Sequence, residues 1–129
     1  VESLVRLLRE LGAEEFHHGD CVWSDAQAHR VAVRLNVRVV VHPPTNPRLR
    51  AWCDPGSEGL ILSPEEYLVR NRAIVDSTQI LLAAPLEQTG ERVRSGTWST
   101  VRYARQVLRP VYVIRPDGHV EFSPSPILE

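Results

Sequence analysis

Patterns typical of helices and of buried strands alternate along the chain. Apolar residues recur at helical spacing over residues 1–11, and Gly12 stands where a helix end favours a left-handed residue. Residues 38–42, whose three central residues are valines, are expected to form a buried strand of the parallel type. Because a helix that connects two neighbouring strands leaves them parallel, the alternation predicts an α/β fold. We expect a three-layer, Rossmann-like, doubly wound and mostly parallel sheet.

Local signals place the other expected elements. Ser63-Pro64-Glu65-Glu66 has the sequence of a helix start with Ser63 as the N-cap. Val101, Ala104 and Leu108 predict the buried face of the last helix. Residues 115–118 predict the turn of an antiparallel hairpin at the C-terminal sheet edge. Further strands are expected at residues 15–18, 79–84, 111–114 and 119–122, helices at residues 28–35 and 67–75, and an irregular run at residues 123–126.

The composition fits one globular domain over residues 1–129. Of the 129 residues 43% are hydrophobic, which is enough for a single core. The net charge of -1 gives no overall attraction to nucleic acid or membranes, so any anion site must be local. Cys21 and Cys53 lack CxxC spacing and are expected to be free thiols in the reducing cytoplasm. No apolar run reaches the roughly 18 residues of a membrane span.

Three polar corners follow expected strands. They are residues 19–25, residues 43–46, and Pro85 together with residues 95–100. The carboxyl ends of parallel strands meet at one sheet edge, so the corners are expected to converge there on a ligand. Gly96 lets a ligand approach the backbone, and the N–H groups of a helix start attract phosphate. The alternative is that Ser95 or Thr97 only caps a surface helix.

Two further segments have the composition to cover a ligand. Residues 48–56 carry two arginines and a tryptophan and form the expected lid, although ordinary surface loops share this composition. Arg70-Asn71-Arg72 is dense in hydrogen-bond donors. A solvated helix face would explain the two arginines, whereas an asparagine in mid-helix lowers helix propensity and calls for another reason.

Several ordered motifs also resemble a known family. They are Gly19-Asp20-Cys21-Val22 with Asp25, Ala28 and His29; His42-Pro43-Pro44-Thr45-Asn46-Pro47; Tyr67-Leu68 with Arg70-Asn71-Arg72 and Ile74-Val75-Asp76; Ala83-Ala84-Pro85; and the run from Arg94 to Arg105. Together they look like the SLOG superfamily, the Rossmann-like group that includes the DNA-processing protein DprA and the LOG cytokinin-activating hydrolases. The resemblance spans residues 16–118. It implies a nucleotide or nucleotide-derivative site at the strand ends, with Ser95-Gly96-Thr97 on a phosphate.

The chain departs from that family in three places. Trp23-Ser24 stands where similar members have Gly-Ala, which either narrows the pocket or offers an indole that stacks on a base. Thr100 stands where LOG enzymes have a catalytic Glu, which weakens the hydrolase interpretation. The superfamily begins with a central strand that ends in a Gly-Thr or Gly-Ser loop, and we expect this first central strand to be missing from the present chain.

The leading hypothesis is a nucleotide-binding or nucleotide-sensing module. Helix N-termini would hold phosphate, Asp20 or Asp25 would read ribose or base, and Arg70 or Arg72 would close over the charge. The expected ligand-binding residues are Gly19, Asp20, Trp23, Ser24, Asp25, Pro43, Pro44, Arg70, Arg72, Pro85, Ser95, Gly96, Thr97, Trp98 and Thr100.

The runner-up is a LOG-like N-glycosidic hydrolase of nucleoside monophosphates. Such an enzyme needs a carboxylate near the sugar to stabilise an oxocarbenium-like transition state. Asp25 and Asp20 are the catalytic candidates, with Asp76 as a third, and each has the alternative role of a helix cap or helix end.

Two other interpretations have less support. Single-stranded DNA binding, as in DprA, would need a basic and aromatic groove. A metal site from His17, His18 and His29 lacks a cysteine or carboxylate at ligand spacing, so core or surface histidines explain them better and no metal or cofactor is expected. The expected partner is a nucleotide-like small molecule, a homo-oligomer stays open, and no membrane partner is expected.

Overall fold

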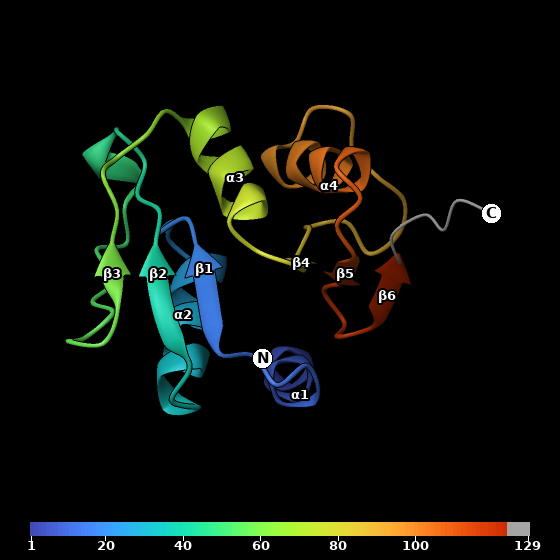
Figure 1. Cartoon of the computed structure of the whole chain (residues 1–129). Helices are drawn as coiled ribbons and strands as arrows, with labels where there is room; N and C mark the ends of the chain where they lie inside the picture. The colour runs from blue at the N-terminus through green and yellow to red at the C-terminus, as the bar shows by residue number, and fades with distance from the viewer. Residues whose placement is uncertain (124–129) are drawn as a thin grey trace. The chain divides into compact units, whose positions relative to one another are not determined.

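The structure of the chain is a computed structural model that describes residues 1–123 (Figure 1). The chain divides into two compact units, residues 1–74 and the residues from Val75 onward. The first unit holds α1 (Glu2–Glu10), β1 (Glu15–His18), α2 (Ser24–Arg34), β2 (Arg38–Val41), the short 3-10 helix η1 (Pro47–Leu49) and β3 (Leu60–Ile61). α3 (Tyr67–Asp76) begins in the first unit, and its last two residues belong to the second, which continues with β4 (Leu81–Ala83), α4 (Gly96–Gln106), β5 (Val111–Ile114) and β6 (Val120–Ser123).

The first unit is a small parallel sheet with α2 packed against it. β2 is the middle strand, and β1 and β3 pair with it in parallel, with Phe16 opposite Val39. Ala32 of α2 meets Val39 and Val41, and all three are almost completely buried. The continuous apolar run of β2 therefore has the role that its sequence predicts, that of a strand covered on its faces.

The first helix is also confirmed. α1 buries Leu7 and Leu8, and Gly12 beyond its end has a φ of +60°, in the left-handed region that glycine adopts without strain.

The predicted helix start at Ser63 is wrong. Residues 60–65 run alongside β2 and the loop that follows it instead. The Glu65 N–H donates to Pro43 O, and Glu65 O accepts from the Thr45 N–H, both at 3.1 Å. These bonds pair backbone groups of residue 65 with the loop after β2. Pairing with this distant segment therefore overrides the helix-start signal of Ser63-Pro64-Glu65-Glu66, and α3 begins at Tyr67.

The second unit is a three-stranded sheet covered by α4. Its order is β4-β5-β6, with β4 parallel and β6 antiparallel to β5. Trp98, Val101 and Ala104 of α4 pack against Val111 and Val113 of β5 in one buried cluster. This unit therefore has a mainly aliphatic core centred on one indole.

The C-terminal hairpin is confirmed. The Gly118 N–H donates to Arg115 O at 2.8 Å, and Gly118 has a φ of +93°, so the predicted turn closes between β5 and β6. Ser123 belongs to β6, and the rest of the expected irregular run, residues 124–126, lies outside the described residues.

Leu108 does not lie on the buried face of the last helix, as its spacing predicts. α4 ends before it, and Leu108 follows with a φ of +64° and 48% exposure. The left-handed backbone turns the side chain off the helical face, and the buried face begins instead with Trp98, one turn before Val101.

The α/β fold with mostly parallel strands is confirmed, since helices and strands alternate in both units. Each unit has its own three-stranded sheet, whereas the single three-layer sheet stays a prediction. Of the helices within residues 1–123, none combines the length and the apolar character needed to cross a membrane.

Candidate functional site

The candidate site lies at the carboxyl ends of β1 and β2 in the first unit. Gly19 follows β1, His42 follows β2, and the Arg70 side chain of α3 reaches both. Its Nη1 donates to Gly19 O and, at 3.3 Å, to His42 O. The structure thus brings together two of the predicted corners and one of the predicted arginines, at the sheet edge where ligands bind in α/β proteins.

Gly19 leaves the space that the Arg70 guanidinium occupies in this contact. A Cβ built on Gly19 would lie 2.5 Å from Arg70 Nη1 and 2.8 Å from Cζ, closer than side-chain carbons approach other atoms. Any other residue here would push the guanidinium away from the strand end, which explains a glycine directly after β1.

The Arg70 guanidinium is buried with neutral partners only. Arg70 is 3% exposed, its Nε donates to Asn71 Oδ1 at 2.7 Å, and its Nη2 lies 3.6 Å from Cys21 Sγ. Within residues 1–123 no carboxylate pairs with it. Because buried charges are normally paired, this guanidinium provides a positive centre that favours an anion.

Asp20, a predicted ligand and catalytic residue, is fully buried in an ion pair. Its Oδ2 accepts from Arg50 Nε at 2.7 Å and its Oδ1 from the Cys53 N–H at 2.8 Å. Burial acts to raise the pKa of Asp20, but these hydrogen bonds outweigh it and hold the pKa below its ordinary value. Both oxygens therefore bind the segment after η1 in this conformation.

Asp25, the second of the three catalytic candidates, is half-buried in the first turn of α2. Its Oδ2 accepts the Cys21 N–H at 3.0 Å, which holds the corner before the helix. Of the two carboxylates, Asp25 is therefore the more accessible.

Trp23 and Ser24 lie exposed at the start of α2. Trp23 is the N-cap residue, its side chain makes no capping hydrogen bond, and the residue is 80% exposed. The first N–H groups of α2 thus have no side-chain cap from the N-cap residue, as an anion-binding helix start requires.

Backbone strain gathers around this corner. Asp20, Trp23 and Trp52 have φ values of +57°, +72° and +57°, and only Asn36 and Leu108 share this feature among the other non-glycine residues of the described chain. Such conformations are costly for residues with a Cβ and are common at ligand sites.

The expected lid, residues 48–56, is hydrogen-bonded to the corner that follows β1. The Ala51 N–H donates to Asp20 O at 2.7 Å, and Arg50 and Cys21 form an isolated antiparallel bridge. The Arg50 guanidinium lies 3.8 Å from the centre of the Trp52 ring, which is 61% exposed. An exposed indole held by a cation offers a flat face for stacking.

The remaining predicted residues of the first unit lie in the loop after β2 and on the exposed face of α3. Pro43 and Pro44 are buried in the loop after β2, where Pro43 O accepts from the Glu65 N–H. Arg72 lies exposed on α3, so Arg70, rather than Arg72, occupies the strand ends.

The predicted residues of the second unit act mainly as helix caps and core. Ser95 is the N-cap of α4 and accepts the Trp98 N–H at 3.3 Å, which is the capping alternative stated above. Trp98 is 1% exposed and its indole N–H donates to Glu87 at 2.8 Å, while the Thr100 hydroxyl donates to Gly96 O at 2.9 Å. Pro85 follows β4, and Gly96 and Thr97 lie half-buried in the first turn of α4.

Two pairs of histidines lie in the first unit, and the sequence alone does not reveal them. His17 Nδ1 lies 2.8 Å from His42 Nε2, and His18 Nε2 lies 3.0 Å from His29 Nδ1. Burial is the main cause that lowers the pKa of both His18 and His42 to about 4. Successive strand residues point to opposite faces, so His17 and His18 find different partners.

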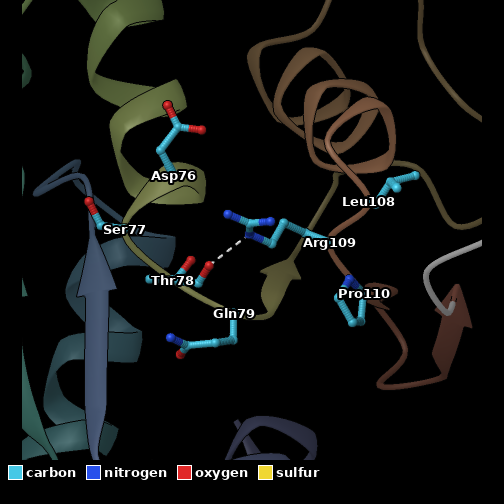
Figure 2. Close-up of a pocket in the computed structure, with 7 residues that line it drawn as sticks. All are labelled: Asp76, Ser77, Thr78, Gln79, Leu108, Arg109 and Pro110. Atoms are coloured by element: carbon cyan, nitrogen blue, oxygen red, sulfur yellow. Dashed lines mark hydrogen bonds between the residues drawn. The ribbon is translucent and has the colours of Figure 1, made fainter.

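A separate hollow of about 270 Å³ lies in the second unit (Figure 2). It is lined by Asp76, Ser77, Thr78, Gln79, Leu108, Arg109 and Pro110, and Arg109 Nε donates to Thr78 O at 2.9 Å. It lies at the amino ends of β4 and β5, opposite to the edge that the sequence predicts. Asp76, the third catalytic candidate, lines it and accepts a hydrogen bond from the Tyr103 hydroxyl at 2.7 Å, whereas none of the predicted ligand-binding residues lines it.

Comparison of the chain with protein-family models, curated proteins and solved structures gave no match. The similarity to the SLOG superfamily therefore stays a prediction, and the geometry of the first unit carries the functional argument.

Proposed function

We propose that the chain is a nucleotide- or nucleotide-derivative-binding module whose first unit holds the anionic part of the ligand beside Arg70. The observation that carries this proposal is the buried Arg70 guanidinium at the ends of β1 and β2, which no carboxylate of residues 1–123 neutralises. A phosphate or similar anion would supply the missing negative charge.

The surroundings suit a phosphate attached to an aromatic base. The uncapped start of α2 adds backbone N–H donors and the positive end of a helix dipole. In residues 48–56, Trp52 stacks on the Arg50 guanidinium and offers an aromatic face. An anion-binding centre and a stacking surface are the two elements that recognise a nucleotide.

The test is a thermal-shift screen of the full chain against nucleoside mono-, di- and triphosphates, free nucleosides and inorganic phosphate. A ligand that binds only the folded protein raises the melting temperature. We expect phosphorylated compounds to raise it and the matching nucleosides to have little effect. The proposal is wrong if no phosphorylated compound shifts the melting temperature.

Two matched variants assign any shift to the site. Arg70→Met removes the charge and should abolish the shift, whereas Arg34→Gln, which changes an exposed arginine near the end of α2, should keep it. Arg72→Gln decides between the two predicted arginines, and we expect it to behave like Arg34→Gln.

One geometric feature keeps a hydrolase as the second candidate function. Asp25 is half-buried beside the uncapped start of α2, where a carboxylate could face the sugar of a bound nucleotide. Incubation with nucleoside monophosphates and chromatography for free base tests this activity. If the native chain releases free base and Asp25→Asn does not, the module is an N-glycosidase. If the chain binds nucleotides and releases no base, it is a binding module.

A further inference from the structure

The first unit brings together three side chains of the kind that bind transition metals. His18 comes from β1, His29 from α2 and Cys53 from the segment after η1. One ligand atom from each lies within 4.8 Å of the other two. Both imidazoles are buried and the thiol is half-buried. The cysteine is 24 residues from the nearer histidine, so no spacing motif announces the cluster.

The hydrogen bonds of the cluster fix where its protons lie. His29 Nε2 donates to Asp54 O at 2.8 Å, which leaves Nδ1 as an acceptor. His18 Nδ1 accepts the Asp20 N–H at 2.9 Å, so His18 Nε2 carries the proton that it shares with His29 Nδ1. Both rings are therefore neutral, as metal ligands must be.

We propose that His18, His29 and Cys53 form a binding site for a zinc-type divalent cation, with a fourth position open to water or another ligand. Two nitrogens on a tetrahedral zinc are about 3.3 Å apart when each Zn–N bond is about 2.0–2.1 Å. His18 Nε2 and His29 Nδ1 are 3.0 Å apart, so the ion fits between the rings after a small separation.

The thiol requires a larger adjustment. A nitrogen and a sulfur on the same ion are about 3.5 Å apart, given Zn–S bonds of about 2.3 Å. All three ligand atoms lie within 4.8 Å of one another, so Cys53 Sγ has to move inward by at most about 1.3 Å. Its position in an irregular, partly exposed segment allows this shift.

The charges and the outer contacts around the cluster suit a cation. The carboxylates of Asp20 and Asp25 act to raise the pKa of His18, against the opposing effect of the Arg70 guanidinium, and the Cys53 backbone N–H donates to Asp20 Oδ1 at 2.8 Å. The Nε2–H···O bond from His29 to Asp54 is the outer-shell contact that orients metal-bound imidazoles.

Binding displaces protons that can be named. The ion takes the place of the proton between the two rings, and the Cys53 thiol loses its proton to solvent as the metal–sulfur bond forms. His18 then keeps a neutral ring by carrying its proton on Nδ1, so the Asp20 N–H turns away from that nitrogen. The Asp20–His18 hydrogen bond is the native contact that the metal replaces.

The test is a titration of the metal-free full chain with Co²⁺ and with Zn²⁺. We expect one Co²⁺ per chain, a thiolate-to-cobalt charge-transfer band in the near ultraviolet and tetrahedral ligand-field bands, all removed when Zn²⁺ displaces the cobalt. The absence of a thiolate band in the native chain would overturn the proposal.

The chain offers matched controls for both ligand types. Cys53→Ser should abolish the thiolate band and His29→Gln should weaken Co²⁺ binding by more than about tenfold. Cys21→Ser and His17→Gln change the other cysteine and the other histidine pair and should keep the band. A band that survives Cys53→Ser, or that Cys21→Ser removes, contradicts the assignment. Circular dichroism of each variant confirms that it is folded before its titration is interpreted.

Discussion

The two units each bury one arginine, but only one of these charges is neutralised. Arg115 in the second unit is 6% exposed and forms a two-bond ion pair with Glu121 at 2.7 and 3.0 Å. Arg70 in the first unit is 3% exposed and has no such partner within residues 1–123. Both guanidiniums also donate to two backbone carbonyls.

The interiors of the units differ in the same way. The second unit is built around Trp98 and aliphatic side chains, whereas the first buries His18, Asp20, His29 and His42. Polar groups are costly to bury, and a small core that contains several of them is typical of a site rather than of a scaffold. The contrast therefore favours the first unit as the location of the proposed site.

The largest expected effect concerns the buried ion pair of the first unit. Asp20→Asn keeps the shape and tolerates the left-handed backbone, but it removes the carboxylate that neutralises the nearly buried Arg50 charge. We expect a loss of about 3 kcal/mol in the free energy of unfolding, measured by urea denaturation. Asp117→Asn at an exposed turn of the second unit is the control and should change the free energy of unfolding much less. Equal losses would remove the contrast between the units.

The next effect is a pH dependence that arises in the first unit. Burial and the neighbouring His17 and Arg70 charges lower the pKa of His42 to about 4, against 6.5 for its ordinary value. Between these values the unfolded chain binds a proton that the folded chain does not, so stability is lost as the pH falls from 6.5 towards 4. We expect His42 to contribute about 2 kcal/mol to this loss. His42→Gln should flatten the dependence and the exposed His119→Gln should leave it unchanged, and identical curves for both would refute the assignment.

The smallest effect compares the two arginines directly. Arg115→Met removes a charge that Glu121 neutralises, whereas Arg70→Met removes a buried charge that has no carboxylate partner within residues 1–123. Each variant also loses two hydrogen bonds to backbone carbonyls. Without phosphate in the buffer, Arg115→Met should be less stable than Arg70→Met by about 1 kcal/mol in denaturant unfolding. A saturating phosphorylated ligand should increase the difference in the free energy of unfolding between the native chain and Arg70→Met. It should leave the difference between the native chain and Arg115→Met unchanged. The reverse order in ligand-free buffer would show that Arg70 is an ordinary structural residue.

The sequence predicts the elements whose signals are local. The apolar run of β2, the amphipathic pattern of α1 and the turn before β6 each lie within one segment, and the structure confirms them. The corners after β1 and β2 follow from the same pattern, because strand ends are readable once the strands are.

Features that depend on distant pairing are missed. The helix signal at Ser63 loses to backbone bonds with the loop after β2, and β3 has only two residues with no pattern of their own. The pairing of His18 with His29, and the approach of Cys53 to both, depend on a segment folding back onto the corner after β1. A single sequence shows which side chains could take part in such a cluster, but it does not show that the fold brings them together.

The placement of the tryptophans gives the protein an internal optical label. The second unit has one shielded indole, Trp98, whereas Trp23 and Trp52 of the first unit face solvent at 80% and 61% exposure. Emission from an indole shifts to longer wavelength when water reaches it, so unfolding of the second unit should dominate the spectral change. A quencher dissolved in the buffer should instead act first on Trp23 and Trp52, and so report on ligands that cover the first unit.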